Sequence, residues 1–331
     1  MERNVLVDRL KGYACFLVLF GHVIMGIRLA GINIPVFFEG VEKFLWSFHV
    51  SLFMFLSGVV YKETGEWKRK KTKARFILSK LCGLGIPYVV FSAVYIFINS
   101  FVGEANTNSS VSDILNIWKT PVAQYWFLYA LFFLFCIWGS LSGILKNWTI
   151  TILVVLIGYI LPLCGIGLGS FDIVFYSALA FGLGTSVSFA KLFEIPNFVK
   201  WVVIISHIIA STVLIVFDKI ELSFVKEIMM LYGIYASILL ISLIQDYKWI
   251  SRFLNFMNRY SFQTYLLHTI FTAGARILLL RFNITWWWLH VILGTTCGIG
   301  CSVLVSEIAK KVPFFNFFFF PTKVLKNKKR E

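Results

Sequence analysis

Long apolar segments recur along the whole of this chain of 331 residues. Each runs for roughly 16–25 residues, the length that a helix needs to cross the hydrocarbon core of a bilayer. The chain is 59% hydrophobic and 14% charged, whereas a soluble domain has about 45–50% apolar and about 25% charged residues. The sequence therefore predicts an all-α fold, a polytopic bundle of membrane-spanning helices.

The apolar blocks and the breaks between them predict about ten transmembrane helices. Pro162 and the glycines at 165, 167 and 169 interrupt the fifth and sixth segments, which makes these two the least regular. The predicted spans are 12–29, 44–61, 76–101, 124–145, 149–164, 172–190, 201–217, 227–245, 261–280 and 286–308.

The distribution of positive charge predicts the orientation. If the N-terminus lies in the cytoplasm, the inner segments hold 23 of the 31 Lys and Arg residues. Cytoplasmic loops of membrane proteins carry such an excess, so both termini are expected in the cytoplasm. The net charge of +15 then records membrane orientation, and no nucleic-acid partner is expected.

One membrane domain, 1–310, accounts for nearly all of the chain, followed by an aromatic and basic cytoplasmic tail, 311–331. The tail is expected to anchor at the interface near anionic lipid. No small-x-small cleavage site follows the first apolar block. The six cysteines show no CxxC spacing, so they are expected to pack, and no metal site is expected.

The first span carries the strongest candidate for chemistry. Lys11 and His22 are eleven residues apart, which places them on one face of a helix, about 16 Å apart. Asp8 lies within roughly 60° of the same line, and Gly21 beside His22 leaves room for a substrate. His22 can serve as a general base oriented by a nearby acid, here Asp8. The alternative is a neutral imidazole that is hydrogen-bonded inside the bundle.

The other histidines divide into two groups. His49 enters the second span from the outside, so it can reach a depth similar to that of His22. A polar residue near the lipid head groups explains it equally well. His268 in the ninth span is expected to be a structural hydrogen-bonding residue, whereas His207 and His290 are expected to be structural or interfacial. The basic loop 62–75 either sets topology or attracts a phosphorylated ligand.

Four segments taken in order resemble the integral-membrane acyltransferase 3 family over nearly the whole chain. They are DRLKGYACFLVLFGHV (8–23), FHVSLFMFLSGVVYK (48–62), YWFLYALFFLF (125–135) and RYSFQTYLLHTIF (259–271). The resemblance implies transfer of an acyl group, usually acetyl, to a carbohydrate hydroxyl. The implied donor is cytoplasmic acetyl-CoA as a co-substrate, with no bound cofactor. The implied acceptor is a polysaccharide or glycolipid outside the cytoplasm, at the plasma membrane of a bacterium.

The resemblance also assigns residues. The family's basic residue and histidine, ten residues between them, correspond to Lys11 and His22, and Asp8 begins the same motif. The family's pair of arginines before a proline corresponds to Lys80 and Gly83, so the second charge is missing there, and basic residues of 68–75 are candidates to replace it.

The remaining assignments concern substrate binding. Arg9 and Lys11 are expected to hold phosphate, and Asp8 to position a basic neighbour, while Trp126 and Tyr125 are expected to stack against a sugar. His49 and Lys80 are further candidates for substrate binding. Either His22 activates the sugar hydroxyl directly or an acyl-enzyme forms first.

The leading hypothesis is therefore a membrane O-acetyltransferase of a surface glycan. The alternative is a transporter or flippase for a glycan or its lipid-linked precursor. The lack of a visible internal repeat and the basic inner edge count against transport. A purely structural scaffold is disfavoured because intramembrane polar residues usually mark function.

Overall fold

A computed structural model describes residues 4–69, 72–101 and 111–322. The described residues form helices and connecting turns without a strand, which confirms the predicted all-α class. By length and hydropathy, seven helical segments of the described chain can cross a membrane. They are Val5–Leu29, Val36–Thr64, Lys73–Phe101, Ala123–Leu141, Asn197–Val216, Phe224–Ile244 and Trp287–Lys311.

The other three predicted spans are also helical, although they do not meet those criteria. α8 (Asn147–Leu163) has 17 residues and α9 (Asp172–Ser186) has 15, which is short for a span. α13 (Ser261–Arg281) has 21 residues but buries polar side chains, among them Gln263, His268 and Arg276. The number ten and the cytoplasmic termini stay predictions.

The chain divides into two compact units with three boundaries between them. Two boundaries fall within α3 (His49–Thr64) and α14 (Trp287–Lys311), and the third follows α9 directly. The first unit is Met1–Leu56 with Ser188–Leu304, and the second is Ser57–Val187 with Val305–Glu331. The predicted division at residue 310 stays a prediction. Part of the tail forms α15 (Pro313–Phe319), whereas 323–331 lie outside the described residues.

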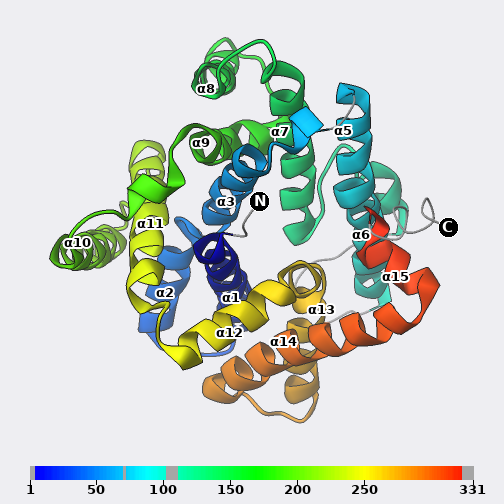
Figure 1. The fold of residues 1–331 in the computed structure, drawn as a ribbon. Helices are drawn as coiled ribbons and strands as arrows, with labels where there is room; N and C mark the ends of the chain where they lie inside the picture. Colours follow the sequence, from blue (N-terminus) through cyan, green and yellow to red (C-terminus); the bar gives the residue numbers. More distant parts are fainter. Residues whose placement is uncertain (1–3, 70–71, 102–110, 323–331) are drawn as a thin grey trace. The chain divides into compact units, whose positions relative to one another are not determined.

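The first unit is built around α1 (Val5–Leu29). Asn4 caps the N-terminus of this helix, because its side chain accepts a hydrogen bond from the Val7 amide. In Figure 1, α1 lies among four helices that it contacts. They are α2 (Val36–Trp46), α11 (Ser223–Ile244), α12 (Lys248–Arg259) and α13. α10 (Asn197–Val216) packs against α11 and α2.

Small residues allow helices of the first unit to approach α1 closely. A Cβ atom on Gly12 would lie 2.1 Å from the Leu254 carbonyl oxygen, so α12 packs directly on the α1 backbone. On α14, Gly294 faces Val23 and Gly298 faces Thr272. This packing surrounds the middle of α1, where the candidate histidine lies.

The second unit centres on α7 (Trp126–Leu141), which contacts α9 and α5 (Lys73–Lys80), while α8 packs against α9. Trp138 of α7 is fully buried, and its indole N–H donates to the Thr185 hydroxyl at 3.1 Å. A π-helical turn, Leu81–Gly85, joins α5 to α6 (Ile86–Phe101). The short α4 (Glu66–Arg69) precedes α5.

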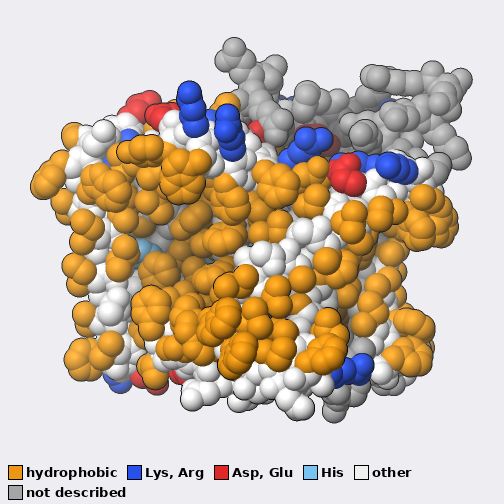
Figure 2. Space-filling model, turned by 90° about the horizontal axis from the view of Figure 1, so that it is seen from below, with side chains coloured by type: hydrophobic (Ala, Val, Ile, Leu, Met, Phe, Trp, Pro, Cys, Tyr) orange, Lys and Arg blue, Asp and Glu red, His pale blue; other side chains and the backbone are white. Residues whose placement is uncertain are grey.

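Many large hydrophobic side chains are exposed on the helices, including Val89, Ile205 and Leu304. On the face drawn in Figure 2, hydrophobic side chains predominate, and the Lys and Arg side chains lie at its upper and lower borders. An exposed apolar surface with charge at its borders is what a membrane protein presents to lipid.

Candidate active site

His22 lies on α1 and its ring is held from three sides. Its Nδ1 lies 2.8 Å from the Val18 carbonyl oxygen, one turn earlier. Since a carbonyl oxygen only accepts, Nδ1 carries the proton, and Nε2 of the neutral ring keeps its lone pair. The ring also packs edge-on against Trp46 of α2, at 5.2 Å between centroids, and against His268 of α13, at 4.9 Å.

His49 and His268 repeat this arrangement on their own helices. His49 Nδ1 donates to the Leu45 carbonyl at 2.6 Å, and His268 Nδ1 lies 2.9 Å from the carbonyl oxygens of Thr264 and Tyr265. Both rings are 0% exposed, and neither Nε2 has a hydrogen-bond partner among the described residues. Trp46 links the group, because its ring contacts both His22 and His49.

We call His22, Trp46, His49 and His268 the histidine cluster. His22 and Trp46 are its partly exposed members, whereas His49 and His268 are buried. His49 joins His22 in this cluster through Trp46, and a similar membrane depth for the two histidines stays a prediction. His268, which sequence reasoning assigned to structural hydrogen bonding, belongs to the same cluster. In the described residues, no group of three or more His, Cys, Asp or Glu has the geometry to hold a metal ion.

Charged residues lie near the C-terminal end of α1, beyond His22. Arg28 donates to both carboxylate oxygens of Glu42 at 2.8 Å, and Glu42 is only 5% exposed. Arg276, two turns beyond His268 on α13, is 8% exposed and lies against Gly26, where a Cβ atom would be 2.2 Å from its guanidinium nitrogen. Sequence reasoning missed these residues, although a charged residue within an apolar segment was the available signal.

The first turns of α1 hold the residues predicted to bind the donor. Arg9 donates to the side-chain oxygen of Gln245 at 3.0 Å, and its buried Nε has no hydrogen-bond partner among the residues that the structure describes. Asp8 and Lys11 are half-buried on the same helix. Because α1 is continuous from Val5 to Leu29, Lys11 and His22 lie about 16 Å apart along one face, as the spacing indicated.

Comparison with known proteins assigns the chain to a family. The model of the acyltransferase 3 family, described as an acyltransferase domain, matches residues 4–307. The chain belongs to this family. Comparisons with curated proteins and with solved structures give no match. Membership and the apolar helices together identify a multi-pass membrane acyltransferase.

The other predicted site residues of this acyltransferase belong to the second unit. Lys80 forms an ion pair with Glu66 at 2.7 Å, and its ammonium lies 4.2 Å from the ring centroid of Phe135. This ion pair already compensates the charge of Lys80, and a substrate-binding role for Lys80 stays a prediction. Lys70 and Lys71 of the basic loop lie outside the described residues.

The two aromatic residues expected to stack on a sugar differ in exposure. Trp126 is half-buried at the start of α7. Tyr125 is 0% exposed, and its ring packs edge-on against Tyr95 at 6.0 Å. The ring of Tyr125 therefore presents no free face, which corrects the expectation that it stacks on a sugar. For Trp126 the stacking role stays a prediction.

Proposed function

We propose that this acyltransferase moves an acyl group, most simply acetyl, from cytoplasmic acyl-CoA to a hydroxyl of an extracytoplasmic polysaccharide or glycolipid. The family supports acyl transfer in general. The observation that carries the finer proposal is the fixed ring of His22. Its Nδ1–H donates a hydrogen bond to the Val18 carbonyl oxygen, so Nε2 keeps a lone pair that can accept a proton. Such a nitrogen is suited to take a proton from a hydroxyl.

In the proposed reaction, His22 Nε2 accepts the proton of the acceptor hydroxyl as its oxygen attacks the thioester carbonyl. The carbon–sulfur bond then breaks, and the CoA sulfur leaves with the proton from the His22 imidazolium. Atoms and charge balance without another co-reactant. The contacts of His22 with Trp46 and His268 keep the ring in one orientation, which favours proton transfer because a reacting group must be aligned.

The donor is proposed to bind at the beginning of α1. Arg9 and Lys11 carry positive charge there, and the phosphates of CoA are anionic. The gap of about 16 Å to His22 lies along the helix axis and is suited to an extended pantetheine arm. The unpartnered Nε of Arg9 supports this assignment, because a buried donor without a partner is costly unless a ligand satisfies it.

An acyl-enzyme remains the alternative route. If the acyl group first passes to an enzyme nucleophile, the protein catalyses exchange of label between free CoA and acetyl-CoA without any acceptor. Direct transfer requires the acceptor for any release of CoA. An exchange assay in membrane vesicles therefore distinguishes the two routes.

The function is tested by supplying radiolabelled acetyl-CoA to inverted membrane vesicles from cells that express the protein. Vesicles with the wild-type chain should incorporate label into glycan as base-labile ester, and vesicles without the chain should not. Mass spectrometry of surface glycan from knockout and parent bacterial strains then identifies the acceptor. Loss of glycan export with unchanged acetyl content would instead favour the transporter.

A further inference from the structure

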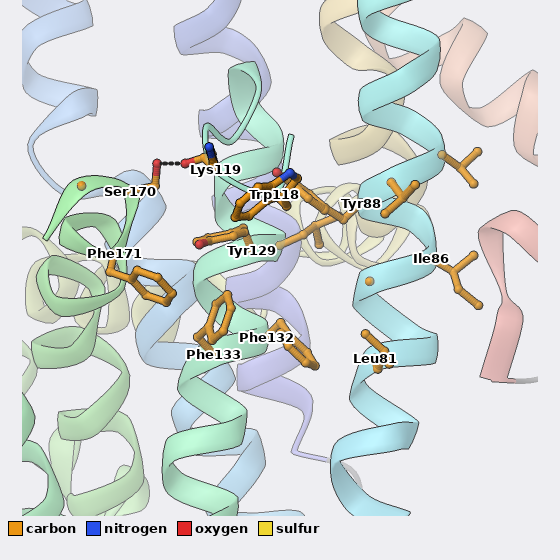
Figure 3. A pocket seen from close by; sticks show the side chains of 15 residues that line it. Leu81, Ile86, Tyr88, Trp118, Lys119, Tyr129, Phe132, Phe133, Ser170 and Phe171 are labelled. Carbon is orange, nitrogen blue, oxygen red and sulfur yellow. Dashed lines mark hydrogen bonds between the residues drawn. The ribbon is translucent and has the colours of Figure 1, made fainter. Parts of the chain in front are cut away.

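The second unit contains a groove that the acyl-transfer chemistry does not use. It runs between α7 and the π-helical turn with the beginning of α6, and its volume is about 920 Å³. Ligand pockets commonly hold about 300–1,000 Å³, so this space is large. Figure 3 shows Tyr129 and Phe133 of α7 and Tyr88 of α6 between the two helices, with Phe171 on one side.

Aromatic rings form one wall of the groove. Tyr129 contacts Phe133 on α7 at 4.8 Å between ring centroids, and Phe133 contacts Phe171 at 5.1 Å. Tyr88 of α6 faces Tyr129 at 5.9 Å. The lining also includes aliphatic side chains, among them Leu81 and Val89. A surface of this kind favours hydrocarbon, because polar groups of a ligand would find few partners there.

Polar groups of the groove gather at one end. Lys119 lies there, with its ammonium 4.9 Å from the ring centroid of Trp118. The Ser170 hydroxyl donates to the Lys119 carbonyl, and the Tyr88 hydroxyl donates to the Ile117 carbonyl. These bonds fix the loop that carries Lys119, while its side chain stays exposed. Figure 3 shows Leu81 at the other end of the groove, away from Lys119.

The backbone leaves the space open at two glycines. Gly85 ends the π-helical turn, and a Cβ atom there would lie 2.9 Å from the Leu81 side chain. Gly169 has φ of +56°, a left-handed conformation that favours glycine, and nothing lies within 4 Å of the position of its missing Cβ. π-Helical turns are uncommon and frequently occur at functional sites.

We propose that this groove binds the hydrocarbon chain of an anionic membrane phospholipid, with the head group next to Lys119. The apolar walls match the hydrocarbon chain, and the ammonium of Lys119 at the polar end complements a phosphate-bearing head group. A soluble sugar does not fit, because the walls offer few hydrogen-bonding groups. The proposal concerns the second unit alone and does not depend on the chemistry of the histidine cluster.

Photo-crosslinking of the full-length protein tests the position of the chain. The probe is phosphatidylglycerol with a diazirine in its acyl chain, reconstituted in nanodiscs of phosphatidylcholine. Peptide mass spectrometry should place adducts on the groove segments 85–90 and 128–133, and excess unlabelled phosphatidylglycerol should compete. Adducts spread evenly over the exposed apolar helices, or competition by phosphatidylcholine alone, would overturn the proposal.

Two matched pairs of variants test the walls and the head-group contact. Val89→Trp fills the groove, whereas Val94→Trp changes another exposed valine of α6 outside it. Lys119→Gln removes the cation of the groove. Its control, Lys146→Gln, removes a cation outside the groove, at the start of α8. Val89→Trp should abolish the groove adducts, and Lys119→Gln should lower the preference for phosphatidylglycerol about fivefold, the effect of one cation near an anionic head group.

The two controls should behave as wild type. Equal labelling of Val89→Trp and Val94→Trp, or an unchanged head-group preference in Lys119→Gln, would contradict the proposal. Preferential retention of free fatty acid or acyl-CoA in the groove of the wild-type protein would also contradict it. The wild-type crosslinking pattern keeps the proposal testable if a variant fails to fold.

Discussion

The imidazole of His268 packs edge-on against that of His22, with ring centroids 4.9 Å apart and planes at 77°. Both rings donate Nδ1–H to backbone carbonyls of their own helices, so their Nε2 lone pairs are turned away from those helices. His268 thus restrains the proposed base without taking its proton. This relationship makes His268 a positioning residue in the acyltransferase.

His268→Ala should lower kcat for acetyl transfer by about tenfold or more, because a small misplacement of a reacting group has a large effect on rate. The KM for acetyl-CoA should stay unchanged. His268→Phe retains an aromatic edge against His22 and should recover part of kcat. If His268→Phe is as slow as His268→Ala, the imidazole nitrogen of His268 is needed and ring packing alone is not its role.

The proposed donor site predicts an effect on substrate affinity. Lys11→Ala should raise the KM for acetyl-CoA by about fivefold to tenfold, because one charge-assisted contact to phosphate is lost. The turnover number should change little. Lys248→Ala removes an exposed lysine at the start of α12 and serves as the control. A drop in kcat at constant KM for Lys11→Ala would place Lys11 outside the donor site.

The Arg28–Glu42 pair predicts a stability effect. Glu42→Gln should lower the free energy of unfolding by about 1–2 kcal/mol, since a buried carboxylate loses two charge-assisted bonds while the half-exposed Arg28 is screened by solvent. Thermal denaturation in detergent measures it. Lys226→Gln breaks an exposed pair with Glu221 and should change the stability by less than about 0.5 kcal/mol. Equal losses of unfolding free energy in Glu42→Gln and Lys226→Gln would contradict a stabilising role for the Arg28–Glu42 pair.

Close packing of α12 on α1 predicts another stability effect. Gly12→Ala places a Cβ atom 2.1 Å from the Leu254 carbonyl oxygen, so the helices must separate, at a cost of about 1–3 kcal/mol. Gly300→Ala on α14 meets nothing within 4 Å and should be neutral or stabilising by up to about 1 kcal/mol. The melting temperature should therefore fall for Gly12→Ala and stay constant or rise for Gly300→Ala. Equal shifts in the two variants would contradict the close packing of α12 on α1.

Much of the helical fold follows from the lengths of apolar blocks, because each predicted span coincides with a helix or a pair of helices. The π-helical turn at Leu81–Gly85 and the burial of Tyr125 could not be predicted, since both depend on neighbours distant in the sequence. Hydrophobic periodicity could not predict the partition into two units either, because the partition also depends on contacts between residues distant in the sequence.

The candidate site was predictable in part. Spacing placed Lys11 and His22 on one helix, and the expected topology indicated that His49 could reach a similar depth. Trp46 and His268 join them only through tertiary packing. Arg276 was detectable as a charge within an apolar segment, although its approach to Gly26 was not.

The central claim is that His22 is the general base, and single-turnover acetyl transfer in proteoliposomes tests it most directly. His22→Gln keeps a polar side chain without a base, so the transfer rate should fall by about 10²–10⁴-fold while acetyl-CoA still binds. His207→Gln, a histidine that packs among Phe44, Phe48 and Tyr232, serves as the matched control. A correctly inserted His22→Gln variant that transfers acetyl at the wild-type rate would contradict the assignment.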